Sequence, residues 1–401
     1  MGNDFLEGLI NKNNSKIVFL VMDGVGGLPL KEGGKTELAA ANTPNLDRLA
    51  GSSICGILDP IMPGITPGSG PGHLALFGYD PLRHNIGRGA LSALGIDFKL
   101  KEGDVCARIN FATMDGDGKI VDRRAGRLDT EENRRLCEKL RKNIKIERVE
   151  LFIETVKEHR AVLVLRGEDL DGHILDTDPQ KNGLLPLDPV ATTKNAKKTR
   201  DIVQQIIQQA KSSIRNEKPA NMILLRGFAR FKTFRSMEER FGLKALAIAQ
   251  YPMYKGVARL IGMDIAPQPQ DLEEEIKLLK DNLDKYDFFF IHFKKTDSSG
   301  EDGNFNAKVK EIEKIDRLIP GILKLQPDVI IVTADHSTPA KLKGHSWHPV
   351  PVIVHSQHCR ADDVKRFDEI SCIKGGIGRM PAFNLMNIAL ANALRLKKFG
   401  A

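Results

Sequence analysis

The sequence has few cysteines and few aromatic residues. Its 401 residues include five cysteines and one tryptophan, and aromatic residues make up only 6%. The cysteines are scattered, odd in number and without CxxC spacing: Cys55, Cys106, Cys137, Cys359 and Cys372. This pattern argues against a disulfide framework and against a zinc ribbon. We interpret the cysteines as reduced packing residues in a reducing compartment.

Segments typical of export and membrane insertion are also missing. The opening MGNDFLEGLINKNNSK carries acids and asparagines where a signal peptide needs a basic start and an apolar run. No run of about 18 apolar residues occurs in the sequence. We therefore expect a cytoplasmic protein that has no membrane partner.

The charge pattern does not favour nucleic acid as a partner. The formal net charge is +8 at pH 7, with 60 Lys and Arg against 52 Asp and Glu. These charges are spread along the chain with few aromatic residues between them, whereas nucleic-acid sites gather basic and aromatic side chains. We expect a small anionic substrate that uses a few of the arginines. The sequence leaves the oligomeric state open, a homo-oligomer included.

Three apolar runs predict strands that are buried on both faces, as in a parallel sheet. They are KIVFLVMDG (16–24), YDFFFIHFKKTD (286–297) and PDVIIVTADHST (327–338). Amphipathic helices lie between them, such as residues 270–283, and NTPNLDRLA predicts a helix with Thr43 as N-cap and Pro44 at its first position. The fold class predicted from this alternation is α/β, with a mostly parallel sheet flanked by helices.

The middle of the chain has a different pattern. Its strand candidates are shorter, and few helices accompany them, among them residues 130–140 and 195–214. The strand candidates are residues 105–113, 149–155, 161–167 and 221–227. We interpret residues 86–235 as a smaller α+β domain inserted into an α/β domain that residues 1–85 and 236–401 form.

Acidic and imidazole side chains follow each of the three long apolar runs. Asp23 follows the first, Asp297 the second, and the pair Asp335 and His336 the third. An Asp after one strand is often only a helix cap or a turn former. In an open parallel sheet, however, ligands bind beyond the carboxyl ends of the strands, so we expect these four groups to converge there. Carboxylate and imidazole ligands suit Mn²⁺, Zn²⁺ or Mg²⁺.

Two further histidines, His345 and His348, stand in the loop KLKGHSWHPVPVIVHS before another apolar run. A lone histidine in such a loop would more often be a surface residue or a core residue. Because this segment closely follows TADHS, in a region already rich in ligand types, we expect at least one of the two to be a metal ligand.

Ser69 stands in a bare loop, TPGSGPGHLALFGYD (66–80), with one serine among four glycines and two prolines. A tight turn explains such a loop. A nucleophile explains it equally, because glycines let a substrate approach and a helix N-terminus favours negative charge on an oxygen. This stretch alone leaves both interpretations open.

The order of the motifs carries a family resemblance. MDGVGG, TPGSGPGHLALFGYDP, HFKKTDSSGEDG, VTADHS and GHSWHPVP, in that order, resemble the alkaline phosphatase superfamily. Within it, the chain is most similar to the archaeal type of cofactor-independent phosphoglycerate mutase. GRGALSALGI, ARINFAT, DRRAGR, EHRAVLVLRG and DTDP extend the resemblance through the middle of the chain, so it spans nearly the whole sequence.

The resemblance implies a two-metal phosphoryl-transfer enzyme that interconverts 3-phosphoglycerate and 2-phosphoglycerate in glycolysis and gluconeogenesis, without 2,3-bisphosphoglycerate. Ser69 would be the nucleophile that becomes phosphoserine. One metal ion would be held by Asp23, Ser69, Asp335 and His336, and the other by Asp297, His345 and the residue at position 301.

Position 301 is the clearest departure from the family pattern, because the residue there is commonly histidine and is Glu301 here. A carboxylate at this position favours Mn²⁺ or Mg²⁺ over Zn²⁺. Mn²⁺ is the expected ion, with Mg²⁺, Co²⁺ and Zn²⁺ left open. If Glu301 faces solvent instead, His348 or a water molecule would fill the position.

The inserted domain would supply the side chains that hold the glycerate. The resemblance favours Arg123 and Arg226, since guanidinium binds carboxylate or phosphate in a fork. Further candidates are Arg124, Arg127 and Arg160. Lys255, in YPMYKGVARLIG, resembles the lysine of the family that neutralises the phosphate.

The sequence leaves two other classes of function open. A metal-dependent phosphatase or another phosphomutase of the superfamily would share every metal ligand and differ only in the inserted domain. A non-enzymatic binding or regulatory protein that kept the fold is the second alternative. Release of free phosphate distinguishes the phosphatase from the mutase, and a lack of bound or activating metal would favour the non-enzymatic protein.

Overall fold

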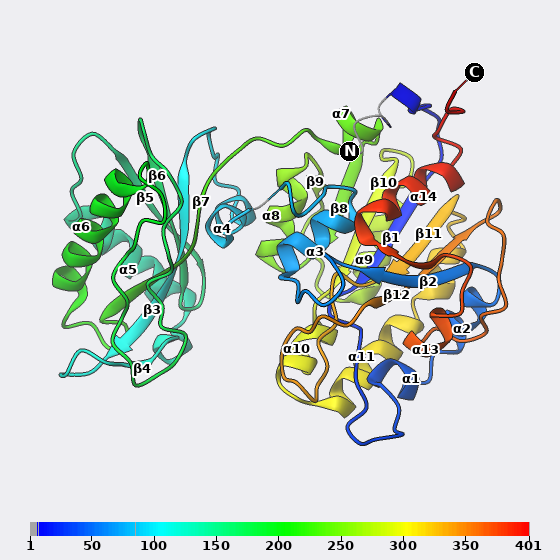
Figure 1. The fold of residues 1–401 in the computed structure, drawn as a ribbon, viewed down its shortest axis with the longest axis horizontal. Helices are drawn as coiled ribbons and strands as arrows, with labels where there is room; N and C mark the ends of the chain where they lie inside the picture. Colours follow the sequence, from blue (N-terminus) through cyan, green and yellow to red (C-terminus); the bar gives the residue numbers. More distant parts are fainter. Residues whose placement is uncertain (1–5, 7, 85, 401) are drawn as a thin grey trace. The chain divides into compact units, whose positions relative to one another are not determined.

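The structure, a computed structural model, describes residue 6, residues 8–84 and residues 86–400. The chain forms two compact units (Figure 1). The first, here called the sheet unit, comprises residues 1–85 and 235–401, and the second, here called the inserted unit, comprises residues 86–234.

The sheet unit is built on an eight-stranded sheet with the order β13-β2-β12-β11-β1-β10-β8-β9. Its strands are β1 (Ile17–Met22), β2 (Ile54–Asp59), β8 (Ala245–Ala249), β9 (Asp264–Ile265), β10 (Phe288–Phe293), β11 (Val329–Thr333), β12 (Val350–Ser356) and β13 (Gly378–Pro381). β12 runs antiparallel to both of its neighbours, and the other neighbouring strands are parallel. The predicted α/β fold class with a mostly parallel sheet is confirmed.

The three strands predicted from the long apolar runs lie side by side in this sheet. β1 pairs in parallel with β10 on one side and with β11 on the other, so Leu20 stands between Ile291 and Val332. Every residue of β1 is fully buried. A strand with both faces covered needs apolar residues at successive positions, which explains why these runs do not alternate with polar residues. The carboxyl ends of the three strands open at one edge of the sheet.

Helices flank the sheet. They are α1 (Glu37–Ala40), α2 (Pro44–Ala50), α3 (Ser69–Leu76), α7 (Met237–Phe241), α8 (Pro252–Leu260), α9 (Leu272–Asn282), α10 (Lys295–Glu301), α11 (Phe305–Asp316), α12 (Ile319–Leu323), α13 (Glu369–Cys372) and α14 (Leu385–Asn392). α2 begins at Pro44 as predicted, but the side chain of its N-cap residue Thr43 makes no capping hydrogen bond. Instead the Asp316 carboxylate accepts from the backbone N–H groups of Asn45 and Leu46, at 3.0 and 2.8 Å. A distant acid therefore satisfies the free donors of the helix start.

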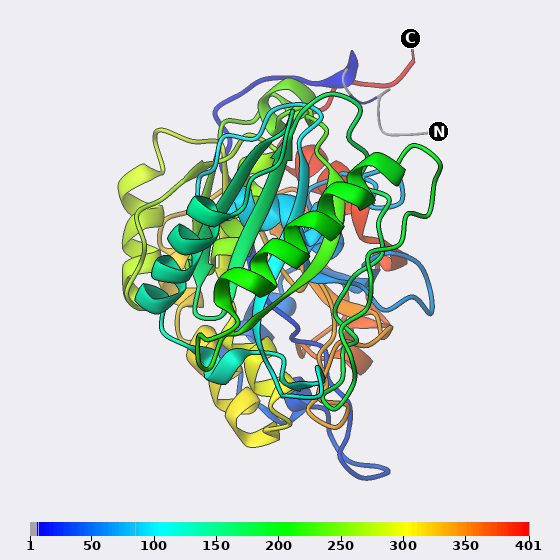
Figure 2. The ribbon, with the colours of Figure 1, turned by 90° about the vertical axis from the view of Figure 1, so that its left-hand side faces the viewer.

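The inserted unit contains an antiparallel sheet of five strands with the order β4-β3-β6-β5, in which β7 also pairs with β3. Its elements are β3 (Val105–Met114), β4 (Ile120–Asp122), β5 (Glu150–Lys157), β6 (Arg160–Arg166), β7 (Met222–Arg230), α4 (Arg88–Gly95), α5 (Thr130–Asn143) and α6 (Lys197–Ile214). Figure 2 shows α5 and α6 lying over one face of this sheet. The core lies between this sheet and the two helices. Alternate strand residues such as Ile109, Leu163 and Leu225 point into it and pack with Leu136 of α5 and Val203 of α6.

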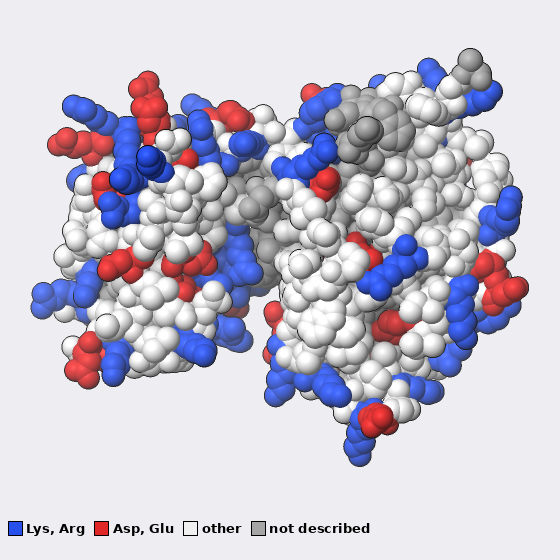
Figure 3. All heavy atoms as spheres, in the orientation of Figure 1, with Lys and Arg blue, Asp and Glu red and all other residues white. Residues whose placement is uncertain are grey.

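Charged side chains of both signs are interspersed on the face drawn in Figure 3, where Asp and Glu lie among the Lys and Arg of each unit. None of the described helices is both long enough and apolar enough to span a membrane.

α3 packs closely against the chain that follows β11. A Cβ atom on Gly72 would lie 2.3 Å from the backbone oxygen of Asp335, well inside contact distance. Glycine at this position lets the helix approach the end of the strand. A larger residue would push α3, which begins at Ser69, away from it.

Gly72→Ala is expected to lower the free energy of unfolding by about 1–3 kcal/mol, because the added methyl group overpacks a backbone contact. Gly68→Ala is the matched control, since a Cβ there would lie 3.8 Å from Pro71 and Gly68 has an ordinary φ of −86°. Urea unfolding of both variants measures the difference. Equal unfolding free energies for the two variants would contradict the packing argument.

Candidate functional site

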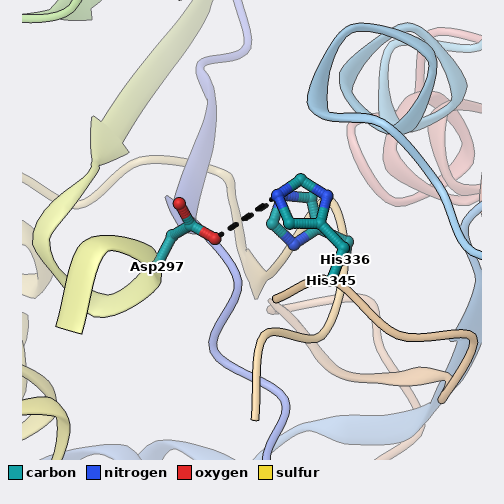
Figure 4. Close-up of side chains that lie close together, drawn as sticks. All are labelled: Asp297, His336 and His345. Atoms are coloured by element: carbon teal, nitrogen blue, oxygen red, sulfur yellow. Dashed lines mark ion pairs between the residues drawn. The ribbon is translucent and has the colours of Figure 1, made fainter. Parts of the chain in front are cut away.

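Two groups of carboxylates and imidazoles meet where β1, β10 and β11 end. We call them the first and second donor groups, because their oxygen and nitrogen atoms could each donate an electron pair to a metal ion. The first donor group consists of Asp23, Asp335 and His336, and the second of Asp297, His336 and His345. Within each group, the atoms that could bind a metal all lie within 4.8 Å of one another. Figure 4 shows the Asp297 carboxylate facing the two imidazole rings. His336 belongs to both groups, so the groups adjoin.

The strand order explains this convergence. Asp23 directly follows β1, Asp335 follows β11, and Asp297 lies in the first turn of α10, just after β10. Because β1 pairs with both neighbours, the residues beyond the three strand ends share one space. His345 comes from the loop after β11, where its Nδ1 lies 2.9 Å from the backbone oxygen of Pro67.

The atoms of the first donor group that could bind a metal are buried, and two of them lack a hydrogen-bond partner among the described residues. Asp23, Asp335 and His336 have no exposed surface, yet Asp23 Oδ1 and Asp335 Oδ2 accept no well-aligned hydrogen bond from the described residues. His336 Nε2 lies 3.2 Å from each of these two oxygens. Buried anionic oxygens are costly unless a cation joins them. The set therefore fits a divalent metal ion that accepts carboxylate and imidazole ligands.

The pKa values of the site reflect its charges. Burial lowers the pKa of His336, but the carboxylates of Asp335 and Asp23 outweigh burial and raise this pKa to about 9. Burial raises the pKa of Asp23, but the opposing effects of Lys294, His292 and His336 outweigh it and hold this pKa well below its usual range. Asp23 is therefore ionised at neutral pH and able to bind a cation.

Ser69 is the first residue of α3 and lies against the first donor group. Its Oγ is 3.3 Å from His336 Nε2, and the residue is only 8% exposed. His73, one turn later, places its Nδ1 2.8 Å from the Ser69 carbonyl oxygen and 3.1 Å from Asp335 Oδ2. The glycine-rich loop thus brings its serine to the ligand-type side chains, at the positive end of a helix.

α8 brings a different residue to the site from the one predicted. The hydroxyl of Tyr254 donates to Asp23, and its ring lies 3.7 Å from the ring of His292. Successive helix residues point about 100° apart, so Lys255 leaves on another face, where its Nζ donates to Gln268. Among the described contacts, the tyrosine of YPMYKG reaches the carboxylates and the lysine does not.

Lys294, which the sequence analysis did not single out, also lies at the site. Its Nζ contacts the Asp297 carboxylate and lies 3.2 Å from Asp23 Oδ2. Burial disfavours its charge, but these two carboxylates outweigh burial and raise the pKa of Lys294 above its usual value. The motif HFKKTD contains two adjacent lysines, and Lys295 is exposed. Lys294 is the N-cap residue of α10 and Lys295 is its first helical residue. The position at which the helix begins therefore decides which of the two lysines points toward the carboxylates.

Lys308, on α11, holds the backbone around the site. It is fully buried, and its Nζ donates to three carbonyl oxygens, at 2.8, 3.0 and 2.8 Å: those of Gly24, Gly26 and Thr338. These carbonyls belong to the loops after β1 and β11. A single ammonium group therefore ties together the two loops that carry the first donor group.

Glu301 and His348 lie outside both donor groups in the described part of the chain. Glu301 ends α10 one turn after Asp297, but its side chain is exposed. His348 Nδ1 bonds instead to Ser346 Oγ, at 3.0 Å. In the structure, the third member of the second group is the imidazole of His336. Among the described residues, neither Glu301 nor His348, the two residues predicted to join Asp297 and His345, lies in this group.

In the inserted unit, Arg123 and Arg226 share one carboxylate. Arg123 holds Asp178 in a fork, with Nε and Nη2 each 2.7 Å from one of its oxygens. Arg226 Nη1 lies 3.5 Å from the same carboxylate, whose side chain is fully buried. The structure therefore brings together the two arginines favoured from the sequence, and Asp178 orients them.

Further arginines gather near His159. Burial and four arginine charges lower the pKa of His159 to about 3; the arginines are Arg160, Arg124, Arg108 and Arg127. The strand register explains part of this gathering. Arg108 stands opposite Arg226 across β3 and β7, and Asn110 stands opposite Arg160 across β3 and β6. Their neighbour Ile109 points to the core, so these side chains lie on the face away from α5 and α6.

Comparison with known proteins identifies the family. The profile described as 2,3-bisphosphoglycerate-independent phosphoglycerate mutase matches residues 50–221. A Thermus thermophilus protein named probable 2,3-bisphosphoglycerate-independent phosphoglycerate mutase is 51% identical over 400 residues, which cover 99% of this chain and 98% of that protein. The chain belongs to this family. An Aquifex aeolicus protein with the same name is 50% identical over 99% of this chain and 100% of its own length.

Solved structures agree with this assignment to the phosphoglycerate mutases. A protein from Pyrococcus horikoshii has a TM-score of 0.84 and 32% identity, over 96% of this chain and 99% of its own. The cofactor-independent phosphoglycerate mutase of Thermoplasma acidophilum has a TM-score of 0.68 and 29% identity, over 94% and 99%. The resemblance seen in the motifs is confirmed. Phosphoglycerate mutases are isomerases, and this chain is an enzyme of that class.

The geometry predicts different effects for His345 and Glu301. His345→Ala removes an imidazole of the second donor group and is expected to weaken the binding of one Mn²⁺ ion by at least about tenfold, since even the outer partners of metal ligands contribute that much. Glu301→Ala removes an exposed carboxylate and is expected to change the affinity by less than about threefold. Calorimetric titration with Mn²⁺ measures both. A larger loss in Glu301→Ala than in His345→Ala would show that the carboxylate binds the ion.

Proposed function

We propose that this phosphoglycerate mutase interconverts 3-phosphoglycerate and 2-phosphoglycerate through a phosphoserine at Ser69, with two divalent metal ions and without 2,3-bisphosphoglycerate. The position of Ser69 Oγ, 3.3 Å from the imidazole shared by both donor groups, carries the proposal. The names of the relatives support the reaction. The alignments support it as well, because they cover 98% and 100% of the lengths of these two relatives.

The donor groups define which residues would hold metal. One ion would be held by Asp23, Asp335, His336 and Ser69, and the other by Asp297 and His345, whose ring stacks on that of His336 at 3.7 Å. When bound, the ions would lower the pKa of the serine hydroxyl and neutralise the charge of the phosphoryl group. Mn²⁺ is the ion we propose, because a mixture of carboxylates and imidazoles suits it.

The chain's own residues orient the nucleophile. A serine hydroxyl is almost wholly protonated at neutral pH and needs activation. Ser69 begins α3, and the positive end of a helix dipole favours negative charge on a nearby oxygen. His73 links the Ser69 carbonyl oxygen to Asp335, so the start of the helix and the first donor group are held in one arrangement.

The reaction balances as two transfers. In the first, Ser69 Oγ forms a bond to phosphorus and loses its proton, while the bond from phosphorus to the glycerate oxygen breaks and that oxygen takes up a proton. In the second, the other glycerate hydroxyl attacks the phosphoserine and loses its proton, and Ser69 Oγ leaves and is protonated. No water is consumed.

A mutase differs from a phosphatase because it must keep the glycerate bound between the two transfers. The anionic groups of phosphoglycerate are a carboxylate and a phosphate, and guanidinium binds both in a fork. We therefore include Arg123 and Arg226 in the proposal as substrate-binding residues, since the buried Asp178 fixes their orientation. Further residues proposed for this role are Arg124, Arg127 and Arg160.

Ser69→Ala is expected to reduce mutase activity by more than about a thousandfold, because the residue that carries the phosphoryl group is lost. Thermal unfolding and Mn²⁺ content should stay close to those of wild type. The control is Ser52→Ala, in which an exposed serine of the same unit loses its hydroxyl. An enolase-coupled assay measures the rates. Activity of Ser69→Ala within tenfold of wild type would exclude the phosphoserine.

The product distinguishes the mutase from a phosphatase of the same superfamily. Incubation with 3-phosphoglycerate is expected to yield 2-phosphoglycerate with little free phosphate. Free phosphate as the main product would favour the phosphatase, since both enzymes would use the same donor groups.

Removal of metal is expected to abolish activity, because the serine needs a cation for its activation. After dialysis against EDTA the enzyme should be inactive, and Mn²⁺ should restore it. Added 2,3-bisphosphoglycerate should restore nothing. Full activity after EDTA, or an absolute requirement for 2,3-bisphosphoglycerate, would contradict the proposed mechanism.

A further inference from the structure

The hydroxyl group of Thr338 lies between two of the side chains that would hold metal. Its Oγ1 is 2.6 Å from Oδ1 of Asp297, which belongs to the second donor group, and 2.9 Å from Nδ1 of His336, which belongs to both. All three side chains are fully buried. One hydroxyl therefore joins the shared imidazole to the carboxylate of the second donor group.

The chemistry of these groups fixes the direction of both hydrogen bonds. The Asp297 carboxylate also contacts the ammonium of Lys294, which favours its ionised form. An ionised carboxylate accepts hydrogen bonds and donates none, and a hydroxyl has a single hydrogen to give. Thr338 therefore donates to Asp297 and accepts from His336. The hydrogen in the second bond belongs to Nδ1 of the imidazole.

The other ring nitrogen of His336 faces the first donor group. Its Nε2 lies 3.2 Å from Asp23 Oδ1, 3.2 Å from Asp335 Oδ2 and 3.3 Å from Ser69 Oγ. A histidine binds a metal ion through a ring nitrogen that carries no hydrogen. Because Nδ1 donates its hydrogen to Thr338, Nε2 is the nitrogen that remains for an ion among these oxygens.

We infer that Thr338 is a positioning residue of the metal site, whose hydroxyl holds the ring of His336 so that Nε2 points to the first ion. The inference rests on the metal-binding part of the proposed function. Thr338 acts through His336 and is not itself a ligand. A partner that holds the second nitrogen of a metal-binding histidine fixes both the tautomer and the orientation of the ring.

The surrounding backbone keeps the hydroxyl of Thr338 in place. The backbone N–H of Thr338 lies 3.1 Å from the carbonyl oxygens of Gly24 and Gly26, and its own carbonyl oxygen accepts from Lys308 at 2.8 Å. A Cβ atom on Gly24 would lie 2.5 Å from Thr338 Oγ1 and 2.9 Å from Asp297 Oδ1. Glycine at position 24 thus leaves the space that the hydrogen bond between these two atoms needs.

Calorimetric titration of the metal-stripped full chain with Mn²⁺ tests the inference. Thr338→Val removes the hydroxyl and keeps the branched shape, and we expect the Kd of at least one Mn²⁺ ion to rise at least about tenfold, as when other outer partners of metal ligands are removed. Thr338→Ser keeps the hydroxyl and should stay within about threefold of wild type. An unchanged Kd in Thr338→Val, or an equal loss in Thr338→Ser, would overturn the inference.

Thr333→Val is the matched control. Thr333 is also fully buried, and its hydroxyl donates to the carbonyl oxygen of Pro351 at 2.9 Å, an atom of neither donor group. The same substitution there removes a buried hydrogen bond of the fold and should change the Kd for Mn²⁺ by less than about twofold, since no metal ligand loses a partner. A loss in Thr333→Val as large as that in Thr338→Val would contradict a specific role of Thr338.

Thermal unfolding separates the positioning role from a purely structural one. A ligand raises the melting temperature according to its concentration relative to its Kd. At one Mn²⁺ concentration, the rise above the value in EDTA should therefore be smaller for Thr338→Val than for wild type and Thr333→Val. Equal rises in the three proteins would exclude the positioning role.

The same titration distinguishes failure of the proposed function from failure of the inference. A wild-type chain that binds no Mn²⁺ would overturn the metal site itself. A wild-type chain that binds Mn²⁺ with affinities that Thr338→Val leaves unchanged would overturn only the role of Thr338.

Discussion

Three carboxylates buried at the ends of neighbouring strands are the constraint on which the site depends. Asp23, Asp297 and Asp335 have no exposed surface, and like charges repel strongly where water is excluded. The structure surrounds them with cations and donors: the imidazole of His336 lies 3.2 Å from two of them, and the Thr338 hydroxyl donates to Asp297 at 2.6 Å. The parallel pairing that assembles the carboxylates therefore also creates the demand for positive charge that a metal site uses.

Buried donors, rather than regular secondary structure, hold the backbone around these carboxylates. Lys308 joins the loops after β1 and β11 through three carbonyl oxygens, and the Thr296 hydroxyl donates to the carbonyl oxygen of Asp23 at 2.5 Å. Gly72 lets α3 reach the same place from another direction. Ligand-type side chains held by such a frame keep their mutual distances, which is what a preorganised site requires.

The inserted unit gathers side chains of the opposite charge. Its sheet is covered by α5 and α6 on one face and carries arginines on the other, where Asp178 is buried between Arg123 and Arg226. Burial, together with the charges of the surrounding guanidinium groups, lowers the pKa of His159. The sheet unit thus gathers carboxylates that need cations, and the inserted unit gathers guanidinium groups, two of which share one buried carboxylate.

The sequence by itself determined the buried strands, the acids and imidazole that follow them, the glycine-rich loop of Ser69 and the family, because burial on both faces and strand ends leave local patterns. Tertiary structure alone decided the rest. Tyr254 rather than Lys255 reaches the carboxylates because a step of one residue turns a helix by about 100°, and Lys294 points inward because α10 starts there. The motif predicts a metal ligand at position 301, yet the residue there, Glu301, is exposed. Which side chain enters a site depends on the phase and pairing of whole elements, and those are set by contacts between residues far apart in the chain.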